Sequence, residues 1–255
     1  MSKTRTYQIA EQNIQITSVH DMVHEHCKEY LILDDVPIKK SIQVVTSQEN
    51  IDFERKRSEQ EDIREGLPIH NWSDAYLEEL AVYRIIAEQM PERDVVLVHG
   101  SAVCVDGKAY LFTAKSGTGK STHVKLWQEL LGDRVTVIND DKPLIRLTDK
   151  QAVIYGTPYN GKHRSGSNIS APLKAISLLE QADHNYIKQI TKEEAFPLLL
   201  QQAYRSENPE TMSKIVSLLA KLTTFVSFWK MGCNMDISAA RMAFDVMSGK
   251  NPEGQ

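Results

Sequence analysis

The fold is indicated by one stretch of the chain, Tyr110-Leu-Phe-Thr-Ala-Lys-Ser-Gly-Thr-Gly-Lys-Ser-Thr122. Its first four residues are strand-like, and a turn of small residues follows them. The segment after the turn has helical spacing of its apolar residues, which are Val124, Leu126, Trp127, Leu130 and Leu131. A strand that leads through a glycine-rich turn into a helix is the context that a phosphate-binding P-loop requires.

The residues of the turn have the chemistry of a P-loop. Glycines let the backbone aim successive N–H groups at one phosphate, and the helix dipole adds positive potential there. Lys120 is expected to reach the outer phosphates of ATP, and the hydroxyl of Ser121 is expected to be a Mg²⁺ ligand. The predicted nucleotide contacts are Ser116, Gly117, Thr118, Gly119, Lys120, Ser121 and Thr122.

One position departs from the P-loop pattern G-x4-G-K-[ST]. Ala114 stands where the first glycine belongs. An alanine fits at this position if its backbone is extended rather than left-handed. The alternative interpretation is a glycine-rich turn with an incidental lysine. The flanking strand and helix, and the carboxylates downstream, favour the P-loop.

Two carboxylates follow the next strand-like segment. Val135-Thr-Val-Ile138 ends at Asn139, and Asp140 and Asp141 lie 20 and 21 residues after Lys120. This separation lets an adjacent parallel strand deliver carboxylates beside the loop. Neighbouring aspartates point in different directions, so one can hold Mg²⁺ while the other accepts a proton from an attacking hydroxyl. The alternative for this segment alone is a solvated acidic turn.

The bulk composition excludes several classes of protein. The chain has 41% hydrophobic and 25% charged residues, and its formal net charge of -4 argues against non-specific nucleic-acid binding. No apolar run approaches the roughly 20 residues of a membrane span, and the N-terminus lacks the apolar stretch of a signal peptide. The three cysteines have no spacing typical of a disulfide framework or a zinc site. We therefore expect a cytoplasmic protein without nucleic-acid or membrane partners.

The order of elements predicts two parts. Residues 1–70 mix short alternating segments with polar connections, which predicts a small β-rich N-terminal section packed on a core. We expect residues 71–255 to form that core, which carries the nucleotide-binding loop. Within it we expect a helix from Ser73 to before Pro91, a hairpin turning at Asp106-Gly107, a second hairpin joined through residues 148–150, and helices that begin at Thr191, Asn208 and Asp236.

The motifs resemble the kinase domain of the HPr kinase/phosphorylase family and, more distantly, the ATP-dependent phosphoenolpyruvate carboxykinases. Three segments match in order, namely His99-Gly100, Ala114 to Thr122, and Asn139-Asp-Asp-Lys-Pro143. A closer likeness is to HPr-kinase-like proteins found beside ribosomal-peptide maturation genes, through Ser116 to His123, Asn139 to Pro143 and Thr157 to Lys162. The resemblance covers roughly residues 70–250, or alternatively the whole chain, and implies an α/β P-loop kinase core with a mixed sheet and flanking helices.

The resemblance also implies roles for individual residues. Ser121 and Asp141 would bind the metal, Asp140 would be the acid/base group, and His99 would face the transferred phosphoryl group. Lys162, in a basic, glycine-bearing loop, could neutralise charge on the transferring phosphate. The alternatives are a histidine hydrogen-bonded at a strand end for His99 and a solvated surface loop for Lys162.

The sequence therefore predicts an enzyme, an ATP- and Mg²⁺-dependent kinase that transfers the γ-phosphate to a hydroxyl acceptor. The acceptor is a serine or threonine of a peptide or protein, or a small hydroxylated metabolite such as free serine. A non-catalytic nucleotide sensor is the alternative of a different class, and the paired carboxylates favour catalysis over it. Relatives of this kind are often oligomeric, so a homo-oligomer is also expected.

Overall fold

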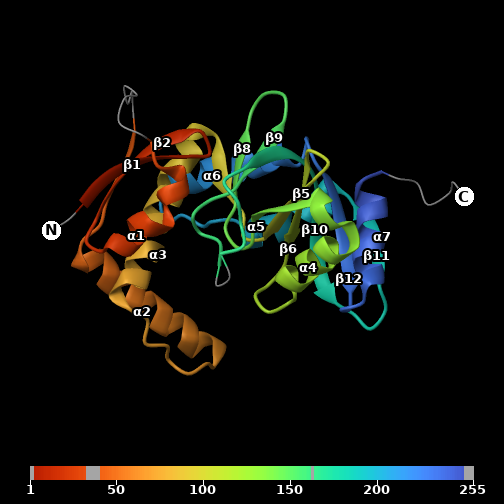
Figure 1. The fold of residues 1–255 in the computed structure, drawn as a ribbon, viewed down its shortest axis with the longest axis horizontal. Helices are drawn as coiled ribbons and strands as arrows, with labels where there is room; N and C mark the ends of the chain where they lie inside the picture. The colour runs from red at the N-terminus through yellow and green to blue at the C-terminus, as the bar shows by residue number, and fades with distance from the viewer. Residues whose placement is uncertain (1–2, 33–40, 162–163, 250–255) are drawn as a thin grey trace, which may run out of the picture. The chain divides into compact units, whose positions relative to one another are not determined.

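The computed structural model describes residues 3–32, 41–161 and 164–249, and the chain divides into two compact units, Met1–Gln89 and Met90–Gln255. Figure 1 shows the elements of both. None of the helices in the described residues is long and apolar enough to cross a membrane. The division places the predicted helix after Ser73 in the first unit, whereas the sequence suggested a boundary between residues 70 and 71.

The first unit combines a three-stranded sheet with helices. The sheet has the order β1-β2-β3, with β1 antiparallel and β3 parallel to β2. Its elements are β1 (Lys3–Ile9), β2 (Gln12–Ser18), α1 (Asp21–His26), the 3₁₀ helix η1 (Lys28–Tyr30), β3 (Ile42–Val45), α2 (Gln48–Glu65) and α3 (Asp74–Gln89).

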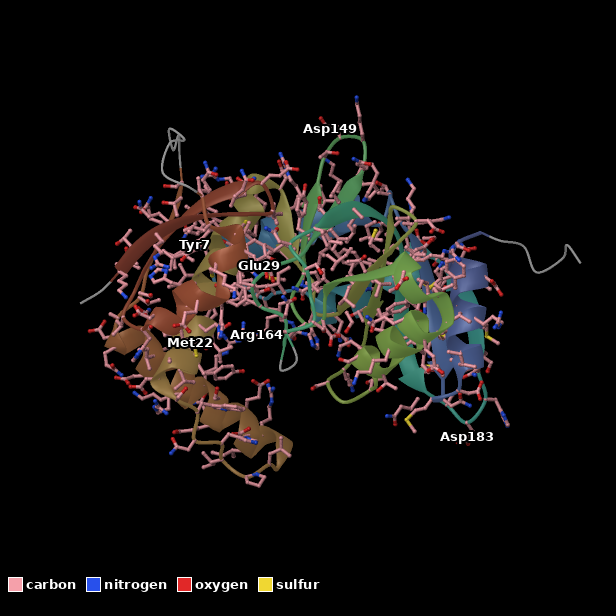
Figure 2. All side chains as sticks on the ribbon, in the orientation of Figure 1. Tyr7, Met22, Glu29, Asp149, Arg164 and Asp183 are labelled. Carbon is pink, nitrogen blue, oxygen red and sulfur yellow. The ribbon has the colours of Figure 1, made fainter. Side chains whose placement is uncertain are left out.

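A polar network holds this unit together. The carboxylate of Glu78 on α3 is fully buried and accepts hydrogen bonds from the main-chain N–H groups of Val19 and His20, over 2.6 and 2.7 Å, and from the hydroxyl of Thr46. Tyr7, labelled in Figure 2, bonds the ring of buried His24 over 2.7 Å. Glu78 therefore joins α3 to the ends of β2 and β3.

The helix α2 is not indicated by the hydrophobic pattern. Over its 18 residues only Ile51 among the apolar side chains is buried. Its ends are defined instead by a capping box of Ser47 with Asn50 and by Gly66 in the left-handed conformation. Ion pairs from Arg55 to Asp74 and from Arg84 to Glu54 attach it to the α3 segment.

The second unit is a mixed sheet with helices on both faces, which confirms the predicted α/β class. The strand order is β4-β8-β9-β10-β6-β5-β7, and β12 pairs with both β10 and β11. The strands are β4 (Val95–Leu97), β5 (Ser101–Val105), β6 (Lys108–Thr113), β7 (Val135–Asn139), β8 (Leu144–Leu147), β9 (Ala152–Tyr155), β10 (Ser170–Gln181), β11 (Tyr186–Ile190) and β12 (Ser227–Cys233).

Two apolar clusters cover the two faces of this sheet. One includes buried residues of α5 (Lys192–Gln202) and α6 (Pro209–Leu222), and the other includes residues of α4 (Lys120–Leu131) and α7 (Ile237–Met247). The short 3₁₀ helices η2 (Met90–Arg93) and η3 (Gly132–Arg134) precede β4 and β7. The loop between β6 and α4 thus starts at the carboxyl end of a central strand and leads into a helix packed on one face of the sheet.

Strand β10 sets the relative directions of its neighbours β9, β6 and β12. Its first residues pair antiparallel with β9, and from Leu173 onward it runs parallel to β6, and from Ala175 parallel to β12. The carboxyl ends of β6, β10 and β12 therefore lie on the same side of the sheet, and ligands bind beside such strand ends in open α/β sheets. The carboxyl end of β7 lies on this side too, because β7 and β6 are both antiparallel to β5.

Local signals in the sequence correspond to observed turns and caps. The β5–β6 hairpin turns at Asp106-Gly107, both with positive φ, and β8 and β9 form the second hairpin. Thr191 makes a capping box with Glu194, and the side chains of Asn208 and Asp236 accept from main-chain N–H groups at the starts of α6 and α7.

We predict that Glu78→Leu lowers the free energy of unfolding by about 3 kcal/mol, because it leaves the main-chain N–H groups of Val19 and His20 and the buried hydroxyl of Thr46 without their acceptor. Urea titration followed by circular dichroism measures this loss. The exposed Glu25→Gln on α1 is the control and should change stability by less than about 0.5 kcal/mol. Equal stability of Glu78→Leu and the parent would show that these hydrogen bonds do not hold the unit together.

Candidate active site

The loop between β6 and α4 has the geometry that its sequence predicts. Gly117 and Gly119 have φ of 76° and 110°, which only glycine adopts at low cost. Lys115, Ser116 and Gly117 are exposed, so their main-chain groups are open to a ligand. Ala114 is buried and is not among the residues with positive φ, so the alanine fits where the pattern has a glycine.

Lys120 lies under this loop. Its side chain is almost entirely buried, with 9% exposed, and its Nζ donates to the carbonyl oxygens of Ala114 at 3.1 Å and Lys115 at 3.3 Å. Within the described residues no carboxylate forms an ion pair with it. Burial lowers the pKa of Lys120, and the charges of Asp141 and Asp140 oppose that shift. The ammonium is thus held among neutral groups, with two carboxylates close enough to act on its charge.

The two aspartates are positioned by Asn139. This fully buried side chain donates to the carbonyl and hydroxyl oxygens of Thr157, and its Oδ1 accepts from the main-chain N–H groups of Asp141 at 2.9 Å and Lys142 at 2.7 Å. Asp140 Oδ1 accepts from the hydroxyl of Ser101 over 2.6 Å. The acidic turn is therefore a fixed structure rather than a solvated one.

The expectation that these aspartates follow a strand adjacent to β6 is wrong. Strand β5 lies between β6 and β7 and is antiparallel to both. Two strand spacings therefore separate β6 from β7, which amounts to about 10 Å. The start of β5 occupies this interval. Gly100 N–H donates to the Asp141 carbonyl oxygen over 3.0 Å, and a Cβ on Gly100 would lie 2.7 Å from the Phe112 carbonyl oxygen.

His99 lies in the same interval, between the P-loop strand and the aspartates. Its carbonyl oxygen accepts from the hydroxyl of Thr113, the last residue of β6, over 2.7 Å. Its Nε2 is 3.5 Å from Asp141 Oδ1, and its Nδ1 is 3.4 Å from Gln202 Oε1. Burial and the charge of Lys120 lower the pKa of His99, and Asp141 opposes this. Gln202 carries no sequence motif, so pattern analysis did not find it.

The loop after β9 lies against the aspartates. The position of a Cβ on Gly161 is 3.3 Å from Asp141 Cβ, and Asn160 beside it is buried. Arg164, labelled in Figure 2, follows in the same loop. The predicted Lys162 and its neighbour at position 163 lie outside the described residues, so their part in the site stays a prediction.

The residues present fit a magnesium ion bound together with phosphates. Ser121 is half-buried in the first turn of α4, and Asp141 is half-buried beside His99 and Lys142. No group of three or more His, Cys, Asp or Glu side chains gathers as a metal site in the described part of the chain. Mg²⁺ in kinases is held by one or two carboxylates with substrate phosphates and water, so a dedicated protein cage is not needed.

Two cavities of about 580 Å³ each flank the loop at the carboxyl ends of the parallel strands. The one on the α5 side is lined by Ser116 and Gly117, and it extends to Lys230 on β12 and Gln202. The one on the α4 side is lined by Thr122 and His123, and it extends to Asp183 in the β10–β11 turn, labelled in Figure 2. The loop therefore has room for a ligand larger than a single phosphate on both sides.

The sequence matches no protein-family profile and no curated protein. Among solved structures, the fold is similar to that of the HPr(Ser) kinase/phosphatase from Coxiella burnetii, with a TM-score of 0.33 and 10% sequence identity. The similarity covers 60% of this chain and 95% of that chain. The chemistry proposed for this chain therefore has to come from the residues of its own site.

His123 connects the site to the core beneath it. Its Nε2 accepts from Trp127 Nε1 over 3.1 Å, its Nδ1 has no hydrogen-bond partner, and burial lowers its pKa from 6.5 to about 4. Because the unfolded chain binds this proton more readily, the stabilisation is complete above pH 6.5 and is lost as the pH falls toward 4. The full effect is about 3 kcal/mol.

We predict that His123→Gln removes most of this pH dependence, since glutamine does not titrate. The measurement is the free energy of unfolding in urea from about pH 7 to about pH 4.5. The exposed His184→Gln should keep the parent slope. A parent slope that persists in His123→Gln would assign the acid sensitivity to other groups.

Proposed function

We propose that this chain is an ATP-dependent kinase that transfers the γ-phosphate of ATP to the hydroxyl of a serine or threonine in a peptide or protein. The observation that carries the proposal is the buried ammonium of Lys120, whose hydrogen bonds within the described residues go to carbonyl oxygens of its own loop. A buried charge is costly unless an opposite charge pairs with it, and nucleotide phosphates would supply that charge.

The nucleotide would bind across the loop. Main-chain N–H groups near Gly117 and the N-terminus of α4 would favour the β-phosphate, and Lys120 would contact the outer phosphates. Thr122 and the loop residues Gly117 and Gly119 line the cavity on the α4 side, so the nucleoside would extend into that cavity. Ser121 and Asp141 would hold Mg²⁺, which neutralises charge on the phosphates.

Phosphoryl transfer would then use the residues on the β7 side of the loop. The acceptor oxygen attacks the γ-phosphorus, and the bond from that phosphorus to the β–γ bridging oxygen breaks, which leaves ADP. The hydroxyl proton passes to the carboxylate of Asp140, whose Oδ1 is already oriented by Ser101. His99 would face the transferred group, and Lys162 would add positive charge from the loop after β9.

We expect Lys120→Ala to weaken ADP binding about 100-fold or more, because it removes the buried charge that pairs with the phosphates. Isothermal titration calorimetry with Mg²⁺ and ADP measures this. Lys125→Ala is the matched control, since Lys125 is an exposed lysine of α4 that lines neither cavity, and it should change the affinity by less than about threefold. Unaltered ADP binding in Lys120→Ala would contradict a nucleotide site at this loop.

We expect Asp141→Asn to abolish the Mg²⁺ dependence of ATP turnover and to lower kcat by about 10²- to 10³-fold, because a neutral amide binds the ion poorly. Turnover is followed as ADP release over a range of Mg²⁺ concentrations. Asp149→Asn, in the β8–β9 turn labelled in Figure 2, is a control of the same chemistry away from the loop. Equal Mg²⁺ activation of Asp141→Asn and the parent would remove Asp141 from the metal site.

The acceptor class can be tested with the parent protein. Incubation with γ-labelled ATP, Mg²⁺ and either a peptide encoded near the gene or free serine gives distinct results. Label in the peptide supports the proposal, and label in the amino acid selects a small-molecule kinase instead. Nucleotide binding without label in either, or in a cell extract, would identify a nucleotide sensor.

A further inference from the structure

Two turns of the second unit form one wall of the α4-side cavity. One turn follows β10 and includes Asp183, labelled in Figure 2, and the other joins β12 to α7 and includes Asn234 and Met235. The remaining lining residues belong to the loop after β6 and to the first turn of α4. A ligand in this cavity therefore contacts both the predicted phosphate-binding loop and the two turns.

Hydrogen bonds of asparagine side chains fix the two turns to each other. The Asn234 side chain donates from Nδ2 to the Asp183 carbonyl oxygen over 3.2 Å, and its Oδ1 accepts from the Asp236 N–H over 3.0 Å. Asn185 Oδ1 accepts from the Asn234 N–H over 2.9 Å. Both polar ends of the Asn234 side chain are thus used within the wall, which is held by its own hydrogen bonds.

Met235 lies on this wall and is not part of the core. Its side chain is 80% exposed, more than that of any other large apolar residue in the described part of the chain. A single exposed apolar side chain is ordinary on a protein surface. Met235 differs because the hydrogen bonds of Asn234 and Asp236 fix the backbone on both sides of it, and because it lines a cavity beside the loop.

The cavity on the α5 side is a poorer match to the base of a nucleotide. Its lining includes the ion pair of Lys230 with Glu180, 2.8 Å apart, and the amide side chains of Gln201 and Gln202. The face of a purine ring instead favours apolar and polarizable contacts, which a thioether supplies. Thr122 follows the two residues that would hold the outer phosphates and Mg²⁺, so a nucleotide anchored there leads into the α4-side cavity.

We propose that the two turns form the base-binding wall of the nucleotide site and that Met235 packs against the face of the purine ring. The unbranched side chain of methionine adapts to the shape of a ring, and the fixed turn keeps it at the cavity. The inference rests on the proposed function for the position of the phosphates, and it is independent of the transfer step and of the acceptor.

The base contact is measured by comparing ADP with tripolyphosphate, which has no base, by calorimetric titration in the presence of Mg²⁺. Met235→Ala should weaken ADP binding about 5- to 10-fold and leave tripolyphosphate binding within about twofold of the parent. Met235→Leu keeps most of the apolar volume and should bind ADP within about threefold of the parent. Ile63→Ala, at a 65% exposed position of α2, is the control and should change neither affinity.

Two results of this titration overturn the inference. One is an equal affinity of Met235→Ala and the parent for ADP. The other is an equal loss for ADP and tripolyphosphate, because it would show a disturbed loop rather than a lost contact with the base.

Photolabelling locates the base directly. The probe is ADP that carries an azide on its adenine ring, and labelled tryptic peptides of the parent protein are identified by mass spectrometry. Trypsin cuts after Lys230 and Arg241, so a base on the wall labels the peptide 231–241, which contains Met235. Label in the peptide 193–205, which carries the α5 residues of the other cavity, overturns the inference.

The base contact and the kinase function fail in different ways. A protein that binds ADP through Met235 but transfers no label from γ-labelled ATP supports the base contact and contradicts the kinase function. A protein that transfers label, and whose affinity for ADP does not depend on Met235, supports the kinase function and contradicts the base contact.

Discussion

The burial of the Lys120 ammonium among uncharged groups is the constraint on which the site depends. The charge is kept where water cannot solvate it well, and its direct partners are carbonyl oxygens of the loop that it supports. Such an arrangement persists only where the surrounding packing fixes it. Here Phe112, Trp127 and His123 form a layer of ring contacts beneath the loop and tie β6 to α4.

The second requirement is a connection between this ammonium and the acidic turn. Residues 99–101 provide this connection. The His99 carbonyl oxygen accepts from the hydroxyl of Thr113 on β6. The Gly100 N–H donates to the Asp141 carbonyl oxygen, and the Ser101 hydroxyl donates to the Asp140 carboxylate. The start of the antiparallel strand β5 therefore links the P-loop strand to the aspartates. Its first residue, Ser101, and the preceding His99 place a hydroxyl and an imidazole in the interval that separates the carboxylates from the loop.

The parts of the fold that could be predicted from the sequence are those set by local chemistry. The glycine turn, the Asp106-Gly107 hairpin and the caps at Thr191, Asn208 and Asp236 depend on residues a few positions apart, and all are observed. Helix α2 was missed because it buries few apolar residues. The place of β5 between β6 and β7, and the contact of Gln202 with His99, depend on pairing between distant segments, which periodicity does not encode. Residue roles at the site stay predictions.

The pairing of β10 affects how the sheet of the second unit can form. Its neighbour β12 lies more than fifty positions later, with register from Ala175 opposite Ser227 to Gln181 opposite Cys233. During synthesis on the ribosome, β6 and its hairpin partner emerge long before β12 does. Parallel pairing across such separations is slow to form. The nascent chain would therefore expose the apolar flank of β10 until β12 has left the exit tunnel, and in this interval the flank is open to aggregation or to binding by a chaperone.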